Sequence, residues 1–112
     1  IKRPLATGLS EKKIQELFEA FCFVCIKNKI TRGLTTEHFD QCFESAKKLL
    51  TEIKCEASEF RDDMTKVTCL ILPDGFDTWV FLHKSVLEYY AASFIKKSNE
   101  DFAKKFFFQH LY

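Results

Sequence analysis

Glycine is scarce in this sequence of 112 residues, which contains three, and neither G-x-x-x-x-G-K-[ST] nor G-x-G-x-x-G occurs. So few glycines exclude a loop that cradles phosphate with its backbone N–H groups. The hydrolase motifs G-x-S-x-G and H-E-x-x-H are missing too. We therefore expect no enzymatic activity from the chain itself, and no nucleotide hydrolysis.

Charge of one sign and long apolar runs are lacking as well. The 17 basic and 16 acidic residues leave a net charge of +1, which gives no overall attraction to nucleic acid or to anionic membranes. No apolar run approaches the length that crosses a bilayer. Residues 1–4 contain no initiator Met and no signal sequence, and residues 106–112 end in apolar side chains, so we expect a piece of a longer protein.

Phenylalanine and cysteine are plentiful instead, with thirteen Phe and five Cys. Cys22, Cys25, Cys42 and Cys69 have apolar neighbours, which predicts small core residues in the reducing cytosol. Cys22 and Cys25 form a C-x-x-C pair that suits a metal or redox chemistry. No second pair completes four ligands, and the flanking Phe and Val are apolar, so we expect core packing, with no zinc and no disulfide.

Helical periodicity organises the first half of the chain. Ser10 suits an N-cap, and apolar residues then recur at helical spacing, with positions 21–26 apolar on every face. A second helix is predicted from Thr35 or Thr36 to Ile53, and a short one from Ser58 to Met64. The two apolar stripes are Ile14, Leu17, Phe18, Phe21 and Cys25 in the first helix, and Phe39, Cys42, Phe43, Ala46, Leu49, Leu50 and Ile53 in the second.

The second half begins with a predicted β-hairpin, with strands at 67–72 and 78–82 around the turn Pro73-Asp74-Gly75. Helices are predicted at 84–97 and from Ser98 or Asn99 onward. This order predicts a mainly helical α+β, winged-helix-like domain over residues 1–97, with 98–112 starting a further helical segment. The last helix would place Phe102, Phe106 and His110 on one face. The expected core includes Phe18, Phe21, Phe43, Leu50, Leu70 and Val80.

Direct DNA readout by such a domain would use the helix before the hairpin. Here residues 56–66 carry four acids and two bases, and the hairpin carries Asp74 and Asp77 with no Lys or Arg. Phosphate contacts need basic side chains, so we expect no direct contact with nucleic acid. His38 and His110 have no partner at ligand or catalytic spacing and read as surface or packing residues.

The segment 81–92 is the most specific feature of the sequence. It reads Phe-Leu-His-Lys-Ser-Val-Leu-Glu-Tyr-Tyr-Ala-Ala. It resembles the end of the winged-helix domain in NACHT-type STAND NTPases, which include NOD-like receptors and bacterial relatives. Their pattern is Phe, apolar, His, any, Ser/Thr, apolar, Gln, Glu, aromatic, apolar, Ala, Ala, and Leu87 stands at the Gln position.

The resemblance implies a regulatory module that follows a nucleotide-binding domain and closes over ADP. It implies that His83 contacts the terminal phosphate, that ADP or ATP with Mg²⁺ belongs to the intact parent, and that the parent forms homo-oligomers when activated. It further implies signalling in the cytoplasm, with antiviral defence if the source is bacterial. Alternatively, the chain is a stand-alone winged-helix domain that binds nucleic acid, or a protein-interaction domain that uses its Phe-rich end.

Overall fold

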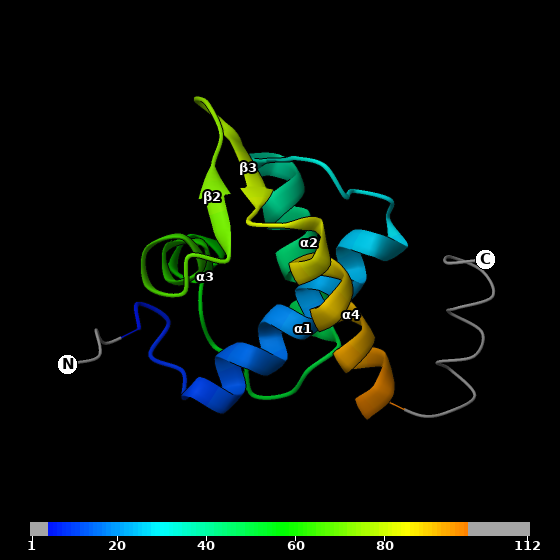
Figure 1. Ribbon diagram of the computed structural model, residues 1–112. Helices are drawn as coiled ribbons and strands as arrows, with labels where there is room; N and C mark the ends of the chain where they lie inside the picture. Colours follow the sequence, from blue (N-terminus) through cyan, green and yellow to red (C-terminus); the bar gives the residue numbers. More distant parts are fainter. Residues whose placement is uncertain (1–4, 99–112) are drawn as a thin grey trace.

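A computed structural model describes residues 5–98 of the chain, shown in Figure 1. The fold is mainly helical with one small antiparallel sheet, and the predicted α+β class is confirmed. The elements in chain order are α1 (Glu11–Lys27), β1 (Leu34–Thr35), α2 (Thr36–Lys48), α3 (Ala57–Asp62), a π-helical turn η1 (Asp63–Val67), β2 (Ile71–Pro73), β3 (Thr78–Phe81) and α4 (Lys84–Lys97). The predicted last helix, with Phe102, Phe106 and His110, lies outside the described residues.

Helix α1 is the central element of the fold. The hydroxyl of Ser10 accepts a hydrogen bond from the amide of Lys13 at 3.2 Å, as the predicted N-cap requires. Every residue from 17 to 25 is buried, because α2 packs against one side of the helix and α4 against another (Figure 1). A helix that is apolar on all faces is stable only inside a core. The expectation of all-round burial is confirmed there.

An aromatic cluster fills the space between α1, α2 and α3. Phe60 of α3 lies at its centre, with its ring centroid 5.3 Å from that of Phe21 and 5.5 Å from that of Phe43. The rings of Phe18 and Phe39 lie 6.5 and 5.9 Å away. All five side chains are at most 1% exposed. Tilted ring pairs at these distances add to the free energy of burial.

The sheet has the strand order β1-β3-β2, with both pairs antiparallel. The hairpin was predicted, but the two-residue strand β1 was not. Its residue Thr35 reads as a helix cap, and the Thr35 hydroxyl does accept a bond from the amide of His38 at 3.1 Å. A two-residue strand that leads directly into a helix leaves no alternating pattern to detect. The hairpin projects away from the helices (Figure 1).

Two predicted boundaries in the middle of the chain are wrong. The second helix ends at Lys48, so Leu49 is 49% exposed, and Ile53 reaches the core from a loop in which Glu52 has φ 62°. The cap of α3 is Glu56, in a capping box with Glu59, and not Ser58. The first error arises because the apolar spacing continues past Lys48, where the backbone leaves the helix. The second arises because Ser is a common N-cap residue, whereas here a capping box formed by Glu56 and Glu59 starts the helix earlier.

The predicted strand at 67–72 is also mostly wrong. Val67 belongs to the π-helical turn, Cys69 has φ 56° and is exposed, and pairing begins only at Ile71. Among the six expected core residues, Phe18, Phe21 and Phe43 are buried, whereas Leu50, Leu70 and Val80 are half-buried. Leu50 and Leu70 pack against the core from the segments that follow α2 and precede β2, outside the helix and strand to which they were assigned.

Two buried carboxylates tie the ends of the described chain to the core. Glu19 of α1 accepts bonds from the hydroxyl of Ser93 at 2.9 Å and from the ammonium of Lys97 at 3.0 Å, which fixes the last turns of α4. Asp63 accepts bonds from the amides of Ala6 at 2.7 Å and Thr7 at 3.1 Å, which fixes the entering segment. A buried carboxylate is tolerated because each is fully hydrogen-bonded. None of the described helices is long and apolar enough to span a bilayer.

Replacing Phe60 tests the role of the aromatic cluster. We expect Phe60→Ala to lower the free energy of unfolding by about 3–5 kcal/mol, because it opens a cavity among four rings. Phe76→Ala is the matched control, since Phe76 is fully exposed and its loss should fall within about 0.5 kcal/mol. Urea denaturation measures both. Equal, small effects of the two substitutions would contradict the proposed centre of the core.

Candidate functional site

His83 lies at the junction of the sheet and α4, where the resemblance placed it. Its backbone is extended (φ −146°, ψ 153°) and it is the N-cap residue of α4. The amide of Val86 donates to the carbonyl of His83 at 3.0 Å, but the imidazole makes no capping bond. The side chain is exposed and has no hydrogen-bond partner within residues 5–98. Local capping therefore does not explain why a histidine stands here.

The start of α4 is electropositive compared with the other helices. Helices α1, α2 and α3 each carry an acid in the first turn, namely Glu11, Glu37 and Glu59. Helix α4 carries none, and its first residue is Lys84. Because the N-terminal end of a helix has a partial positive charge, a lysine there adds to that potential and does not cancel it.

A basic cleft opens beside this junction. It encloses about 310 Å³ and is lined by Thr31 and Arg32 from the α1–β1 connection, by Phe81 at the end of β3, and by Lys84. Arg32 and Lys84 are exposed, and neither forms an ion pair with any residue of the part that the structure describes. His83 does not line the cleft but adjoins Lys84 in the chain. Two unpaired cations and a hydroxyl are suited to bind an anion.

Sequence reasoning identified His83 and missed Arg32 and Lys84. Lys84 carried a detectable signal, because a basic residue at the first helical position is the reverse of the usual preference. Arg32 carried none, since it is brought to α4 only by the pairing of β1 with β3, and β1 was not foreseen. We call the group of Thr31, Arg32, Phe81 and Lys84 the basic cleft below.

The other residues of the 81–92 segment divide between core and surface. Phe81 is half-buried, with its ring 6.3 Å from those of Phe18 and Phe21. Leu87 and Ala91 are 1% exposed, so the position where the family has Gln is a packing position here. Tyr89 is 68% exposed, so its side chain lies on the surface and not in the core. The segment therefore anchors the junction through Phe81 and Leu87 and leaves His83 free.

The surface that a DNA-binding domain would use is electrostatically neutralised. Arg61 pairs with Asp40 at 3.0 Å, and its guanidinium also lies over the rings of Phe39 and Trp79. Lys66 pairs with Asp62 at 3.5 Å. The two bases of residues 56–66 are thus engaged by the chain's own acids and rings, and the segment offers no unpaired cation for a phosphate backbone.

The cysteines are all free thiols, and within residues 5–98 no three metal-ligating side chains come together. Burial raises the pKa of Cys22 and Cys25 well above the usual range. A hydrogen bond from the Cys25 thiol lowers the pKa of Cys42, against the effect of its burial. Cys69, expected in the core, is exposed, and Cys55, which sequence reasoning left out, is buried. Cys69 is displaced because the chain turns there before β2 begins.

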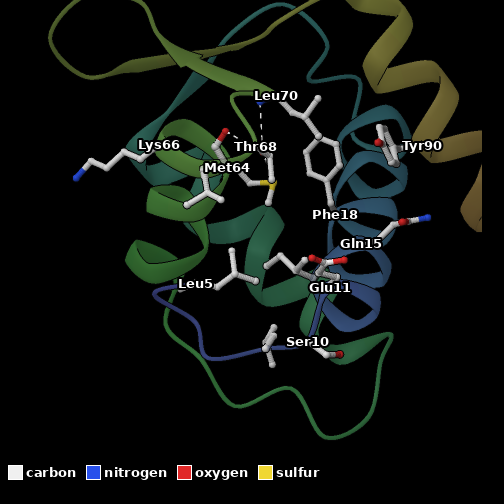
Figure 2. A pocket seen from close by; sticks show the side chains of 13 residues that line it. Leu5, Ser10, Glu11, Gln15, Phe18, Met64, Lys66, Thr68, Leu70 and Tyr90 are labelled. Atoms are coloured by element: carbon white, nitrogen blue, oxygen red, sulfur yellow. Dashed lines mark hydrogen bonds between the residues drawn. The ribbon is translucent and has the colours of Figure 1, made fainter. Parts of the chain in front are cut away.

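A larger, mainly apolar groove lies on another face, between the entering segment, α1 and the π-helical turn (Figure 2). It encloses about 800 Å³ and includes Leu5, Ile14, Met64 and Leu70. The Thr68 hydroxyl donates to the Met64 carbonyl at 3.2 Å and accepts from the Leu70 amide at 3.3 Å, which shapes one wall. No histidine or cysteine lines the groove, and Glu11 is the single carboxylate among its lining residues.

Comparisons of the chain with protein-family models, with curated proteins and with solved structures give no match. The interpretation of the site therefore rests on its geometry and on the residues of the 81–92 segment.

Comparing two helix caps tests whether His83 is a structural residue. We expect His83→Ala to change the free energy of unfolding by less than about 0.5 kcal/mol, because the imidazole makes no local bond. Ser10→Ala should cost about 0.5–2 kcal/mol, since the Ser10 hydroxyl caps α1. Thermal midpoints of the 112-residue chain measure both. A midpoint that falls further for His83→Ala than for Ser10→Ala would make His83 a structural residue.

Thiol reactivity tests the placement of the cysteines. In the native chain, we expect iodoacetamide to modify Cys69 rapidly and to modify Cys22, Cys25, Cys42 and Cys55 only at the rate at which the core opens. Peptide mass spectrometry over time identifies each site. Rapid modification of Cys22 or Cys25 would contradict the position of α1 in the core.

Proposed function

We propose that this chain is a winged-helix regulatory module of a nucleotide-switched NTPase of the NACHT type. The order of elements supports the winged-helix part: helix, strand, two helices, then a hairpin that pairs with the first strand. In that arrangement the β2–β3 hairpin is the wing. The 81–92 segment supports the NACHT part, because its Phe, His, Ser, Glu and Ala residues match that pattern around the strand–helix junction.

The single observation that carries the proposal is the exposed imidazole of His83, which lies next to the basic cleft and makes no hydrogen bond to any residue from 5 to 98. An imidazole N–H is a hydrogen-bond donor, and a diphosphate is a dense acceptor. Arg32 and Lys84 add two positive charges on the same side of α4 and so favour a phosphate group over a neutral ligand. The nucleotide itself would be held by a preceding domain, and the module would contribute the donors that cap its terminal phosphate.

The module then acts as a lid whose position depends on the nucleotide. With ADP bound it stays closed, and exchange for ATP releases it and permits homo-oligomerisation of the parent. A ligand shifts such an equilibrium only through its different affinity for the two states. The proposed setting is cytoplasmic signalling, which agrees with five free thiols, and in a bacterial host it would be antiviral defence.

Replacing His83 in the intact parent tests the proposal. Loss of one charge-assisted bond is worth about 1.5–3 kcal/mol, so His83→Ala should speed ADP release by roughly ten- to a hundredfold and raise basal activity. His38→Ala is the matched control, because His38 is an exposed histidine in the first turn of α2. Release of a fluorescent ADP analogue measures the effect. Equal release from both variants would contradict the proposal.

The isolated chain provides an independent test. We expect it to bind ADP no more tightly than millimolar, because two exposed cations and one imidazole are strongly screened by solvent. Micromolar affinity by calorimetry would mean that the chain carries a nucleotide site of its own.

The gene offers a further test of the NACHT assignment. We expect the reading frame upstream of Ile1 to encode a phosphate-binding loop, and a frame without one would overturn the assignment.

A further inference from the structure

The tip of the β2–β3 hairpin presents a bare aromatic side chain to solvent. Phe76 is 104% exposed, so its side chain packs against no other part of residues 5–98. Single exposed apolar residues are ordinary on protein surfaces, but a fully exposed Phe on a projecting tip is not explained by packing (Figure 1). Asp74 and Asp77 flank it, which makes the tip an aromatic knob with acidic sides.

Hydrogen bonds on both sides of Phe76 hold the hairpin tip in place. The hydroxyl of Thr36 donates to the carboxylate of Asp77, and the indole N–H of Trp79 donates to the same hydroxyl at 3.5 Å. The amide of Asp74 donates to the carbonyl of Thr78 at 2.8 Å, and Gly75 has φ 90°, a conformation that suits glycine in this turn. The start of α2 therefore braces the hairpin on both sides of Phe76, so the position of the tip is fixed before any partner binds.

The basic cleft has the complementary chemistry. Phe81 lines it together with the two cationic residues Arg32 and Lys84. The volume of about 310 Å³ is large enough for a phenyl ring. A Phe flanked by Asp side chains thus fits a cleft in which an aromatic ring is flanked by cations, so that both apolar contact and charge pairing are satisfied together.

The tip cannot reach the cleft of its own chain. Phe76 and Phe81 are joined by the extended strand β3, and five residues at about 3.3 Å each separate them by roughly 16 Å. We propose that the hairpin tip of one copy of this chain (Asp74, Phe76 and Asp77) inserts into the basic cleft of a second copy (Arg32, Phe81 and Lys84). The contact joins two different surfaces, so it is head-to-tail. The contact is tested without the nucleotide hypothesis, although a phosphate and the tip would both use Arg32 and Lys84 and would therefore occupy the cleft in turn.

The contact is small, so the association should be weak in isolation. Interfaces below about 1,200 Å² belong to transient complexes, and we expect a dissociation constant on the order of 0.1–1 mM. It should weaken further at high salt, because exposed charges are screened. In an assembly already held together elsewhere, the same contact would act at a high effective concentration and would set the orientation of neighbouring modules.

Two complementary variants of the 112-residue chain test the proposal. The tip variant is Phe76→Ser with Asp74→Asn, and the cleft variant is Arg32→Glu with Lys84→Glu. The matched controls are Tyr89→Ser, which removes another exposed aromatic ring, and Lys12→Glu with Lys48→Glu, which changes the charge equally. Sedimentation velocity up to about 1 mM measures the average mass, and thermal midpoints verify that each variant is folded.

We expect the wild type and both controls to associate above 13.2 kDa with increasing concentration, and each test variant alone to weaken association at least about tenfold. A mixture of the two test variants should associate again, because the cleft variant keeps its tip and the tip variant keeps its cleft. A monomeric wild type at 1 mM would overturn the proposal. So would variants that associate like the wild type, or a mixture that stays monomeric.

Discussion

The burial of α1 on all sides is the constraint on which the rest of the structure depends. Residues 17–25 are all buried, and the one charged side chain among them, Glu19, is bonded to α4. Other elements must therefore cover the helix: α2 and α4 pack along it, and α3 contacts it through Phe60. The rings of Phe18 and Phe21 meet Phe60 from one direction and Phe81 from another. The position of the sheet–helix junction thus follows from the packing of α1.

The same packing explains how a small module can behave as one body. Asp63 fixes the entering segment and Glu19 fixes the end of α4, so both ends of the described chain are tied to the core by buried, charge-assisted hydrogen bonds. Of the junction and the basic cleft, only Phe81 packs against this body, whereas His83, Arg32 and Lys84 are exposed on its surface. A surface of that kind is free to bind a partner and to release it with the core unchanged. This separation of roles is what the proposed switching requires.

The sequence was informative where side-chain pattern and backbone agree. The first and fourth helices were predicted almost to their ends, because Ser10 caps one and the apolar spacing runs the full length of both. It was misleading where the backbone departs from the pattern, at the positive φ of Glu52 and Cys69 and at the π-helical turn. Such departures are set by tertiary packing, so residues such as Cys69 and Leu49 come out exposed although their neighbours are apolar.

In the candidate site too, residues within a local sequence pattern could be predicted, and residues brought in by tertiary pairing could not. His83 was found because its neighbours in the chain form a local pattern. Arg32 was missed because about half the chain separates it from Phe81 and Lys84, and it joins the cleft only through the short β1–β3 pairing.

A structure of the intact parent with ADP bound would test whether His83 contacts the terminal phosphate. We expect the terminal phosphate within about 3 Å of the His83 imidazole, with Arg32 and Lys84 facing it. A junction that faces solvent, away from the nucleotide, would contradict the account.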